Sequence, residues 1–468
     1  MRLTRRSFLA GAAGAAAGIG GLYELIDHLA SAPTRTARRS LGREQHILDG
    51  LRIVKDNGVE VIVPTLHHEL VTARVTVDPT AKALREAQAD LEHALSRLEH
   101  RLAPVADGLG VTVAWGRPYF GNYVRKLADR HLPVDLRASR ARGREISALL
   151  DARRFPSDPH DVVLEQNDVA VLLRSDSRDH VVEGHRALFD DLGGLWEKTS
   201  IRRGFAGGGF DGQRSLPKQM ALAAGINGAQ LIPETAELFL GFTSTQRANI
   251  GPGRIANLET LGYTEPGYFA GGTHMHVSHI FEDVEAWYLN FDFAERVSTV
   301  FRPGLDVREN TQTVRQDLKD VESPAKVARD YRRHGAIGHS GAIQPTSRLA
   351  EDVRGADGHV YRKGTAIPQR ADFNTLDNPF FWSARPHVDK QLAQPAAGVH
   401  FVVFNPTSDD FNRNRLAMDG LLPDGTRFRF APRDRGQGIN SVLRTSHRQN
   451  FLVPPRRHRS FPLVELLN

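Results

Sequence analysis

The 468-residue chain contains no cysteine. The absence of thiols excludes disulfide bonds, a thiolate nucleophile and an iron–sulfur cluster. Any metal must therefore be held by His, Asp or Glu, or arrive inside a cofactor, and 20 histidines leave both routes available. No apolar run reaches the length of a membrane-spanning helix, so we expect no stable membrane span.

The chain also has only a small excess of one sign of charge. It contains 61 Lys and Arg residues and 55 Asp and Glu residues, for a net charge of +6. The excess is spread through segments of mixed sign. This favours a solvated, slightly cationic surface over nucleic-acid binding, and we expect no nucleic-acid partner. Hydrophobic residues make up 40% of the chain, enough for substantial cores, and the length indicates two or three domains.

The N-terminus has the layout of a twin-arginine export signal. Arg5 and Arg6 precede Ser7 and a short, mildly apolar run that extends to Leu22, and small residues at 30–32 offer a cleavage site. We predict a signal peptide over 1–32, a linker over 33–54, the twin-arginine translocase as export partner, and a periplasmic, cell-surface or extracellular location. The alternative is a chance arginine pair ahead of an apolar helix.

The remainder alternates between helical and strand patterns. Helical spacing predicts a helix over 81–102, and alternating or continuous apolar residues predict strands over 59–63, 111–115, 168–173, 275–280 and 399–404. A glycine-rich, irregular stretch is expected over 199–235, and a last helix from about 439–443. The pattern favours an α+β fold with antiparallel sheets in two similar halves, over 55–240 and 241–468.

Six segments in order resemble the dye-decolorizing haem peroxidase family. They cover residues 110–120, 168–173, 240–242, 271–287, 338–345 and 361–364. The resemblance extends over roughly residues 55–460. It implies two ferredoxin-like halves of the dimeric α+β barrel type, with haem b (iron protoporphyrin) in the second half.

Two residues acquire roles through this resemblance. His339 would bind the haem iron through a neutral imidazole, because it keeps the His-to-Pro spacing of the family's ligand segment. Arg362 would contact the cofactor and stabilise the hydroperoxide anion on the distal side. The alternatives are an ordinary capping or surface His339, His334 as the ligand, and a solvated Arg362.

The position of the family's distal acid departs from its pattern. Ser244 stands where the family carries an aspartate that relays a proton, and a hydroxyl is a poor base at neutral pH. Asp211, in a Gly-x-x-Asp-Gly string, is an alternative acid, or simply part of a turn. His274, His276 and His279 lack the ligand spacing of a zinc site, and we interpret them as histidines on a strand surface.

These observations indicate an exported haem peroxidase that reduces hydrogen peroxide and oxidises a small organic reductant of the phenolic or dye-like type. The missing acid favours a second hypothesis, a haem-binding protein with little peroxidase activity. A third is a cofactor-free exported α+β binding protein. A homo-oligomer is compatible with each of the three.

The export signal is directly testable. Replacing Arg5 and Arg6 together with Lys should leave precursor in the cytoplasm, because the receptor reads the adjacent arginines. Cell fractionation and immunoblotting measure the distribution of the protein. Normal export of the double variant would contradict the twin-arginine assignment.

Overall fold

The computed structural model describes residues 19–30, 42–210, 213–251, 267–315, 322–354, 358–378, 394–429 and 438–468. The strands within these ranges are β1 (Arg52–Asp56), β2 (Val59–Val63), β3 (His67–Val75), β4 (Gly110–Gly116), β5 (Val163–Leu164), β6 (Val169–Ser175), β7 (Trp196–Phe205), β8 (Thr273–Glu282), β9 (Val353–Arg354), β10 (Val360–Tyr361), β11 (Gln369–Arg370), β12 (Phe373–Thr375), β13 (Gly398–Asn405) and β14 (Leu443–Val453). The α-helices are α2 (Ile19–Tyr23), α3 (Ile26–Leu29), α4 (Ala81–Arg101), α5 (Arg117–Asn122), α6 (Arg125–His131), α7 (Leu136–Arg142), α8 (Arg178–His185), α9 (Leu216–Ala223), α10 (Val284–Asn290), α11 (Phe293–Val300), α12 (Pro324–His334), α13 (His339–Ser347) and α14 (Ser408–Met418).

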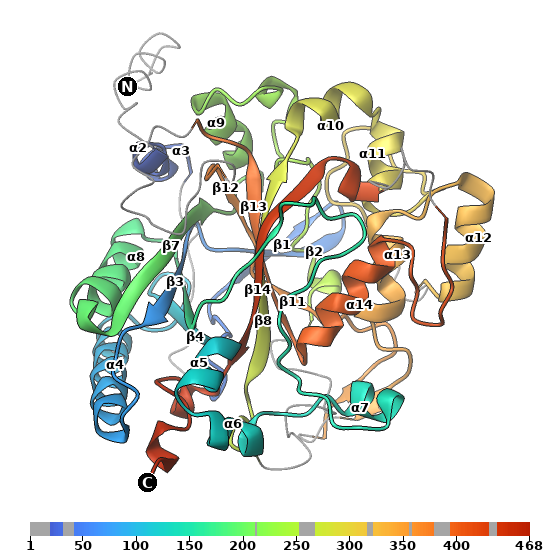
Figure 1. The fold of residues 1–468 in the computed structure, drawn as a ribbon. Helices are drawn as coiled ribbons and strands as arrows, with labels where there is room; N and C mark the ends of the chain where they lie inside the picture. The colour runs from blue at the N-terminus through green and yellow to red at the C-terminus, as the bar shows by residue number, and fades with distance from the viewer. Residues whose placement is uncertain are drawn as a thin grey trace.

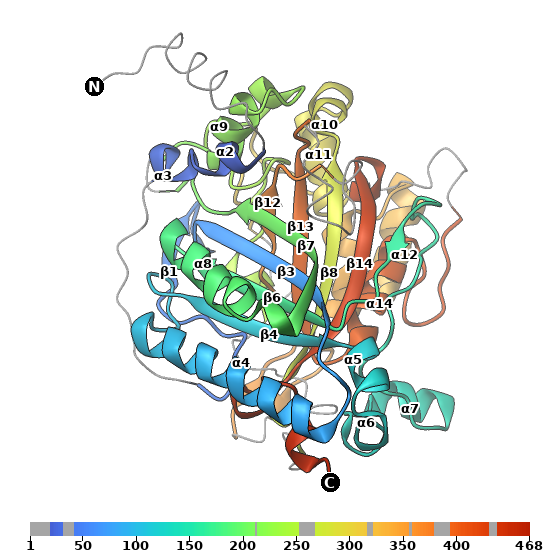
Figure 2. The same ribbon diagram turned by 60° about the vertical axis from the view of Figure 1, so that its left-hand side comes forward.

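The first half of the chain forms a ferredoxin-like unit. Its strands lie in the order β7-β3-β6-β4, all antiparallel to their neighbours, and α4 and α8 cover their outer face (Figures 1 and 2). The longest helix, α4, begins where the Thr80 side chain accepts a hydrogen bond from the Ala83 amide. Its apolar stripe, which includes Leu84, Leu91 and Leu95, is buried against the sheet.

The second half repeats this arrangement. Its strands lie in the order β12-β13-β8-β14, again antiparallel, and α10, α11, α13 and α14 lie outside them (Figure 1). The two halves join where β14 pairs with β4 and where β12 pairs with β7. Pairing therefore leads from β13 through β8, β14, β4, β6, β3, β7 and β12 back to β13, which closes the sheet into a barrel. The predicted α+β fold with two ferredoxin-like halves is confirmed.

The barrel strands have two different faces, because successive side chains of a strand point to opposite sides. On β8, Met275 and Val277 face the barrel core, whereas Ser278 and Ile280 face outward. On β13, Val402 faces the core with them. Both faces are buried, which explains why these strands have continuous apolar runs rather than clean alternation.

Two local predictions are wrong. The stretch 199–235 is not irregular throughout, because β7 runs to Phe205 and α9 begins at Leu216. The predicted last helix is instead a short 3-10 turn that leads into β14. In both places, pairing with a strand distant in sequence determines the local structure.

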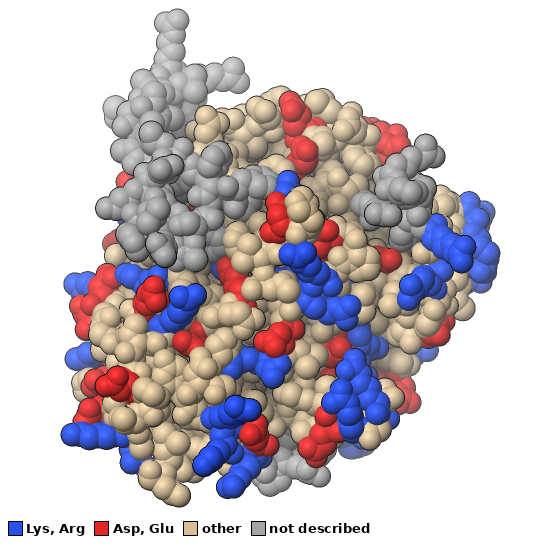
Figure 3. All heavy atoms as spheres, viewed as in Figure 1, with Lys and Arg blue, Asp and Glu red and all other residues tan. Residues whose placement is uncertain are grey.

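Charged side chains of both signs are interspersed on the face seen in Figure 3, with basic side chains gathered over α12. No helix among the residues described here combines the length and the apolar character needed to cross a bilayer.

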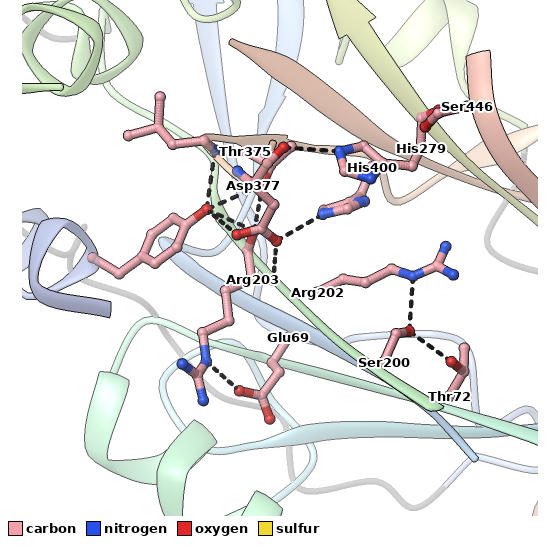
Figure 4. Close-up of polar contacts among 12 residues, drawn as sticks. Glu69, Thr72, Ser200, Arg202, Arg203, His279, Thr375, Asp377, His400 and Ser446 are labelled. Atoms are coloured by element: carbon pink, nitrogen blue, oxygen red, sulfur yellow. Dashed lines mark hydrogen bonds and ion pairs between the residues drawn. The ribbon is translucent and has the colours of Figure 1, made fainter. Parts of the chain in front are cut away.

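The described residues before Ala30 pack against one end of the barrel. The Tyr23 hydroxyl donates to Asp377 Oδ1 at 2.9 Å and accepts from the Leu376 amide at 3.0 Å. Asp377 Oδ2 accepts from the Arg203 amide at 2.9 Å and lies 3.0 Å from His400 Nε2 (Figure 4). Tyr23 thus completes a buried polar network, and it belongs to the region predicted as the signal peptide. Removal of that peptide stays a prediction.

This contact predicts a loss of stability. Tyr23→Phe, in the full chain, should lower the free energy of unfolding by about 1–3 kcal/mol, because it leaves buried polar groups without a partner. A chain that begins at Pro33 should show a loss of stability as well. Urea unfolding followed by circular dichroism measures all three proteins; equal midpoints would contradict a docked N-terminal segment.

Candidate functional site

A cavity of about 250 Å³ lies on the outer face of the second half. Outward-facing residues of β8, β13 and β14 form one wall, including Ile280, Val399 and Phe401. Residues of α13 and α14, which lie side by side, form the opposite wall, and the segment 238–249 closes one end. The helices of this half stand away from the sheet here, whereas those of the first half pack directly on it.

His339 is the first residue of α13 and lines the cavity. The preceding Gly338 has a φ of 65°, and a Cβ on it would lie 2.6 Å from the Phe301 carbonyl oxygen. Only glycine fits this position without strain. The close approach of Gly338 to the end of α11 therefore sets where α13 begins and where His339 is presented.

His339 is suited to bind a metal ion as a neutral ring. Burial, with the nearby charges of Arg370 and Arg415, lowers its pKa to about 4, so the imidazole is neutral at physiological pH. Its Nδ1 is buried and makes no hydrogen bond to any residue of the described ranges. The predicted ligand thus lies in the cavity with a neutral ring.

Ser244 also lines the cavity, and the carboxyl groups of Glu237 and Asp372 lie near it. The Ser244 amide donates to Glu237 Oε2 at 3.3 Å, and the Thr245 hydroxyl donates to Glu237 Oε1 at 2.5 Å. Burial raises the pKa of Glu237 to about 7. Asp372 lies near the Ser244 hydroxyl on the same cavity wall.

Arg370 and Asp372 project into the same cavity from one extended segment. Ala371 between them and Phe373 after them belong to the barrel core, and the Ala371 amide donates to the Val402 carbonyl at 2.8 Å. Residues two apart in an extended chain share a face, which places Arg370 and Asp372 together on the cavity side. Burial raises the pKa of Asp372, although Arg370 and Ser244 oppose the shift.

Glu282, at the end of β8, is a third buried carboxyl group on the cavity wall. Burial, and secondarily the charge of Asp372, raises its pKa to about 8. Its Oε2 is without a hydrogen-bond partner among the described residues. Glu282 is therefore largely protonated at neutral pH.

Cationic side chains occupy the rest of the polar wall. Arg415 and Arg448 are neutralised by Asp158, and Arg415 also by Asp419. Arg348 instead donates to neutral oxygens, the Ala248 and Gly364 carbonyls at 2.9 and 3.0 Å and the Asn249 amide oxygen. Burial lowers the pKa of Arg348 to about 10, so it stays charged. Arg348 can therefore bind the carboxylate of a ligand by donating hydrogen bonds to it.

Arg362, the predicted distal arginine, lies outside the cavity. Its side chain is 76% exposed, and its Nη1 donates to Asp352 Oδ2 at 2.6 Å. It follows the short β10 strand, whose pairing with β9 directs it to solvent. The structure brings His339 and Ser244 to one cavity but not Arg362. The arginines that line this cavity are Arg348, Arg370, Arg415 and Arg448.

The other candidates are not in the cavity. His334 is exposed at the end of α12, and Asp211 lies outside the described residues. The prediction that His274, His276 and His279 are on a surface is wrong, because all three are buried. His276, for example, stacks on Phe411 and hydrogen bonds to Asn450 Oδ1 at 2.6 Å. Burial lowers the pKa of all three rings.

Sequence reasoning missed Arg370, Asp372, Glu237 and Glu282. The alternation of polar and apolar residues over 370–373 is a signal for an extended segment with Arg370 and Asp372 on one face. For Glu237 and Glu282 we find no comparable signal, since isolated glutamates are ordinary surface residues.

Comparisons with known proteins agree with the fold. A family model described as a family of unknown function (DUF7405) matches residues 65–455. No curated protein matches the chain. Among solved structures, a candidate DyP-type peroxidase from Shewanella oneidensis has a TM-score of 0.50 and 12% identity, covering 86% of this chain and 96% of that one.

Two further solved structures are similar at the same level. A DyP-type peroxidase from Cellulomonas bogoriensis has a TM-score of 0.49 and 18% identity, covering 88% of this chain and 96% of that one. DyPB from Rhodococcus jostii RHA1 has a TM-score of 0.48 and 14% identity, covering 91% and 99%. The similarity to the Shewanella oneidensis structure shows that the chain has the fold of the DyP-type peroxidases, as the sequence resemblance predicted.

The buried Glu282 predicts a pH dependence of stability. Its pKa is raised from the unfolded value of about 4.5 to about 8, so the stabilisation from its bound proton is complete below pH 4.5 and is lost as pH rises through 8. Glu282→Gln should abolish this loss and raise the free energy of unfolding at pH 8 by on the order of a few kcal/mol.

Urea unfolding at acid and alkaline pH checks the effect. Glu285→Gln, which removes an exposed carboxyl group three residues away, is the matched control. If both variants follow the same pH dependence as the unmodified chain, Glu282 is not the group responsible.

Proposed function

The chain belongs to the DUF7405 family, a family of unknown function, and we propose that it binds haem b in the cavity described above and acts as an exported haem-dependent peroxidase. Hydrogen peroxide would be the oxidant, and phenolic or dye-like compounds the reductants. The observation that carries the proposal is the neutral, buried His339 on the cavity wall, with Nδ1 free of hydrogen bonds to the described residues.

The residues present fit a haem. His339 would hold the iron, Arg348 would accept a carboxylate of the porphyrin, and apolar side chains would contact its faces and exclude water. These apolar side chains include Leu240, Phe242, Phe301, Ile343 and Met418. The cavity volume of about 250 Å³ lies just below the range of roughly 300–1,000 Å³ typical of ligand pockets. When bound, haem supplies the redox chemistry of peroxide reduction.

The remaining polar side chains suit the handling of peroxide. Arg370 makes no ion pair within the described ranges, so its positive charge can stabilise an anion in the cavity. Arg362 has no place in this scheme, because it is exposed and bound to Asp352.

The second hypothesis is haem binding with little turnover. It is favoured by Ser244, which lines the cavity and aligns with the acid of the dye-decolorizing peroxidase family. The two hypotheses differ in peroxide-dependent oxidation of a phenolic reductant by the haem-loaded protein. Export by the twin-arginine route remains part of the proposal on the strength of Arg5, Arg6 and the apolar run after them.

The role of His339 predicts the effect of a substitution. His339→Ala should abolish the Soret band of the haem-loaded protein or weaken haem binding at least ~10-fold, because the imidazole that would hold the iron is removed. Haem titration followed by absorption measures the affinity. Circular dichroism should show an intact fold.

His334→Ala is the matched control, since this exposed histidine lies outside the cavity. It should bind haem like the unmodified protein. If His334→Ala loses the Soret band and His339→Ala keeps it unchanged, the iron ligand is His334 and not His339. No Soret band in the unmodified protein would contradict haem binding altogether.

A further inference from the structure

The polar side of the cavity contains a carboxyl group where a distal acid is needed, although position 244 does not provide it. Asp372 comes from the segment between β11 and β12, whereas Ser244 comes from the segment before β8, more than 100 residues earlier in the chain. Both side chains line the large cavity, and Arg370 lines it with them. The arrangement combines a base, a hydroxyl group and a cation.

Asp372 and Arg370 also line a second, smaller cavity of about 60 Å³. Its other lining residues include Thr65, His68, Arg174 and Thr245. One water molecule needs roughly 10–15 Å³ of such volume, so a small polar molecule fits there. The two residues thus form a partition between a large, mainly apolar cavity and a small cavity of mixed lining.

The neighbouring carboxyl groups are poorer bases. Glu282 also lines the large cavity, but its pKa of about 8 keeps it protonated at neutral pH. The carboxylate of Glu237 is engaged by the Ser244 amide and the Thr245 hydroxyl. Asp372 has the lower intrinsic pKa, and the charge of Arg370 favours its ionised form.

We propose that Asp372 is the acid–base residue of this cavity, in the role that the sequence assigned to position 244, with Arg370 as its cationic partner. The inference rests on the proposed haem-dependent function. The Asp372 carboxylate takes the proton from one oxygen of hydrogen peroxide, which leaves a hydroperoxide anion and a neutral carboxyl group. The guanidinium of Arg370 balances the charge of the anion, and Asp372 can return the proton to the second oxygen.

This role has a defined pH dependence. Burial raises the pKa of Asp372, so the carboxylate is a stronger base than an exposed aspartate, and its activity is lost as pH falls through the raised pKa. The ionisable groups that face the partition from other elements are Glu237, Glu282, His339, Arg348, His68 and Arg174.

Cyanide binding tests the inference without turnover. Hydrogen cyanide is protonated near neutral pH and must lose its proton to bind ferric haem as the anion, so it requires the same base as peroxide. The haem-loaded protein is mixed with cyanide by stopped flow between about pH 5 and pH 8, and the shift of the Soret band gives the binding rate. Asp372→Asn should slow cyanide binding ~10²-fold near pH 7, with haem still bound. It should also remove the fall of the binding rate at acid pH, called the acid limb of the pH profile.

Asp352→Asn is the matched control, because it also removes an aspartate carboxyl group near an arginine, but one that lies outside the cavity. It should bind cyanide at the unmodified rate. Asp372→Glu keeps a carboxyl group and should retain the acid limb with a shifted midpoint; this variant carries the test if Asp372→Asn does not fold.

The outcomes separate the two proposals. If all variants bind haem, and Asp372→Asn binds cyanide at the same rates as the unmodified protein, only the role of Asp372 is overturned. An Asp372→Glu midpoint identical to that of the unmodified protein does the same. No Soret band in the unmodified protein overturns the haem-dependent function, and this inference with it.

Discussion

The register of β8 is the constraint on which the rest of the structure depends. Its residues pair with β13 from His274 to Phe281 and with β14 along the other edge. Because its side chains alternate, the same strand fills the barrel core with Met275 and Val277 and presents Ser278 and Ile280 to the cavity. A shift of one residue would exchange the two sets of side chains, so the same register determines both the barrel core and the cavity wall.

The two halves share a topology but use their outer faces differently. In the first half, α4 and α8 pack directly on the sheet, and Leu91, Leu95 and Val181 fill the space between. In the second half, α13 and α14 leave the cavity in the equivalent position. Gly338 at the start of α13 enables this, since its close approach to the end of α11 sets the position of the helix. One topology therefore produces a packed layer in one half and a ligand-sized space in the other.

Removal from water determines the protonation states around the cavity. Burial lowers the pKa of His339 to about 4 and raises that of Glu282 to about 8, so these two groups are largely neutral near physiological pH. The arginines stay charged, because even the lowered pKa of Arg348 is about 10. A neutral imidazole and cationic groups on one wall are compatible with the proposed binding of an iron porphyrin with carboxylates, and the proposed proton exchange by Asp372 depends on the same removal from water.

The sequence by itself determined the features that repeat over short distances. The spacing of Leu84, Leu91 and Leu95 predicted α4, and apolar runs predicted β4, β6, β8 and β13, because these patterns report local period and burial. The order of motifs predicted the fold of two ferredoxin-like halves and directed attention to His339 and Ser244. Only the tertiary structure decided which arginine and which acid join them. Arg362 and Arg370 look alike in sequence, but pairing of β10 with β9 turns the first to solvent, and pairing of β11 with β13 turns the second into the cavity. Asp372 meets Ser244 only because the barrel closes, and strand pairing over more than 100 residues is a property of the whole chain that no local pattern records.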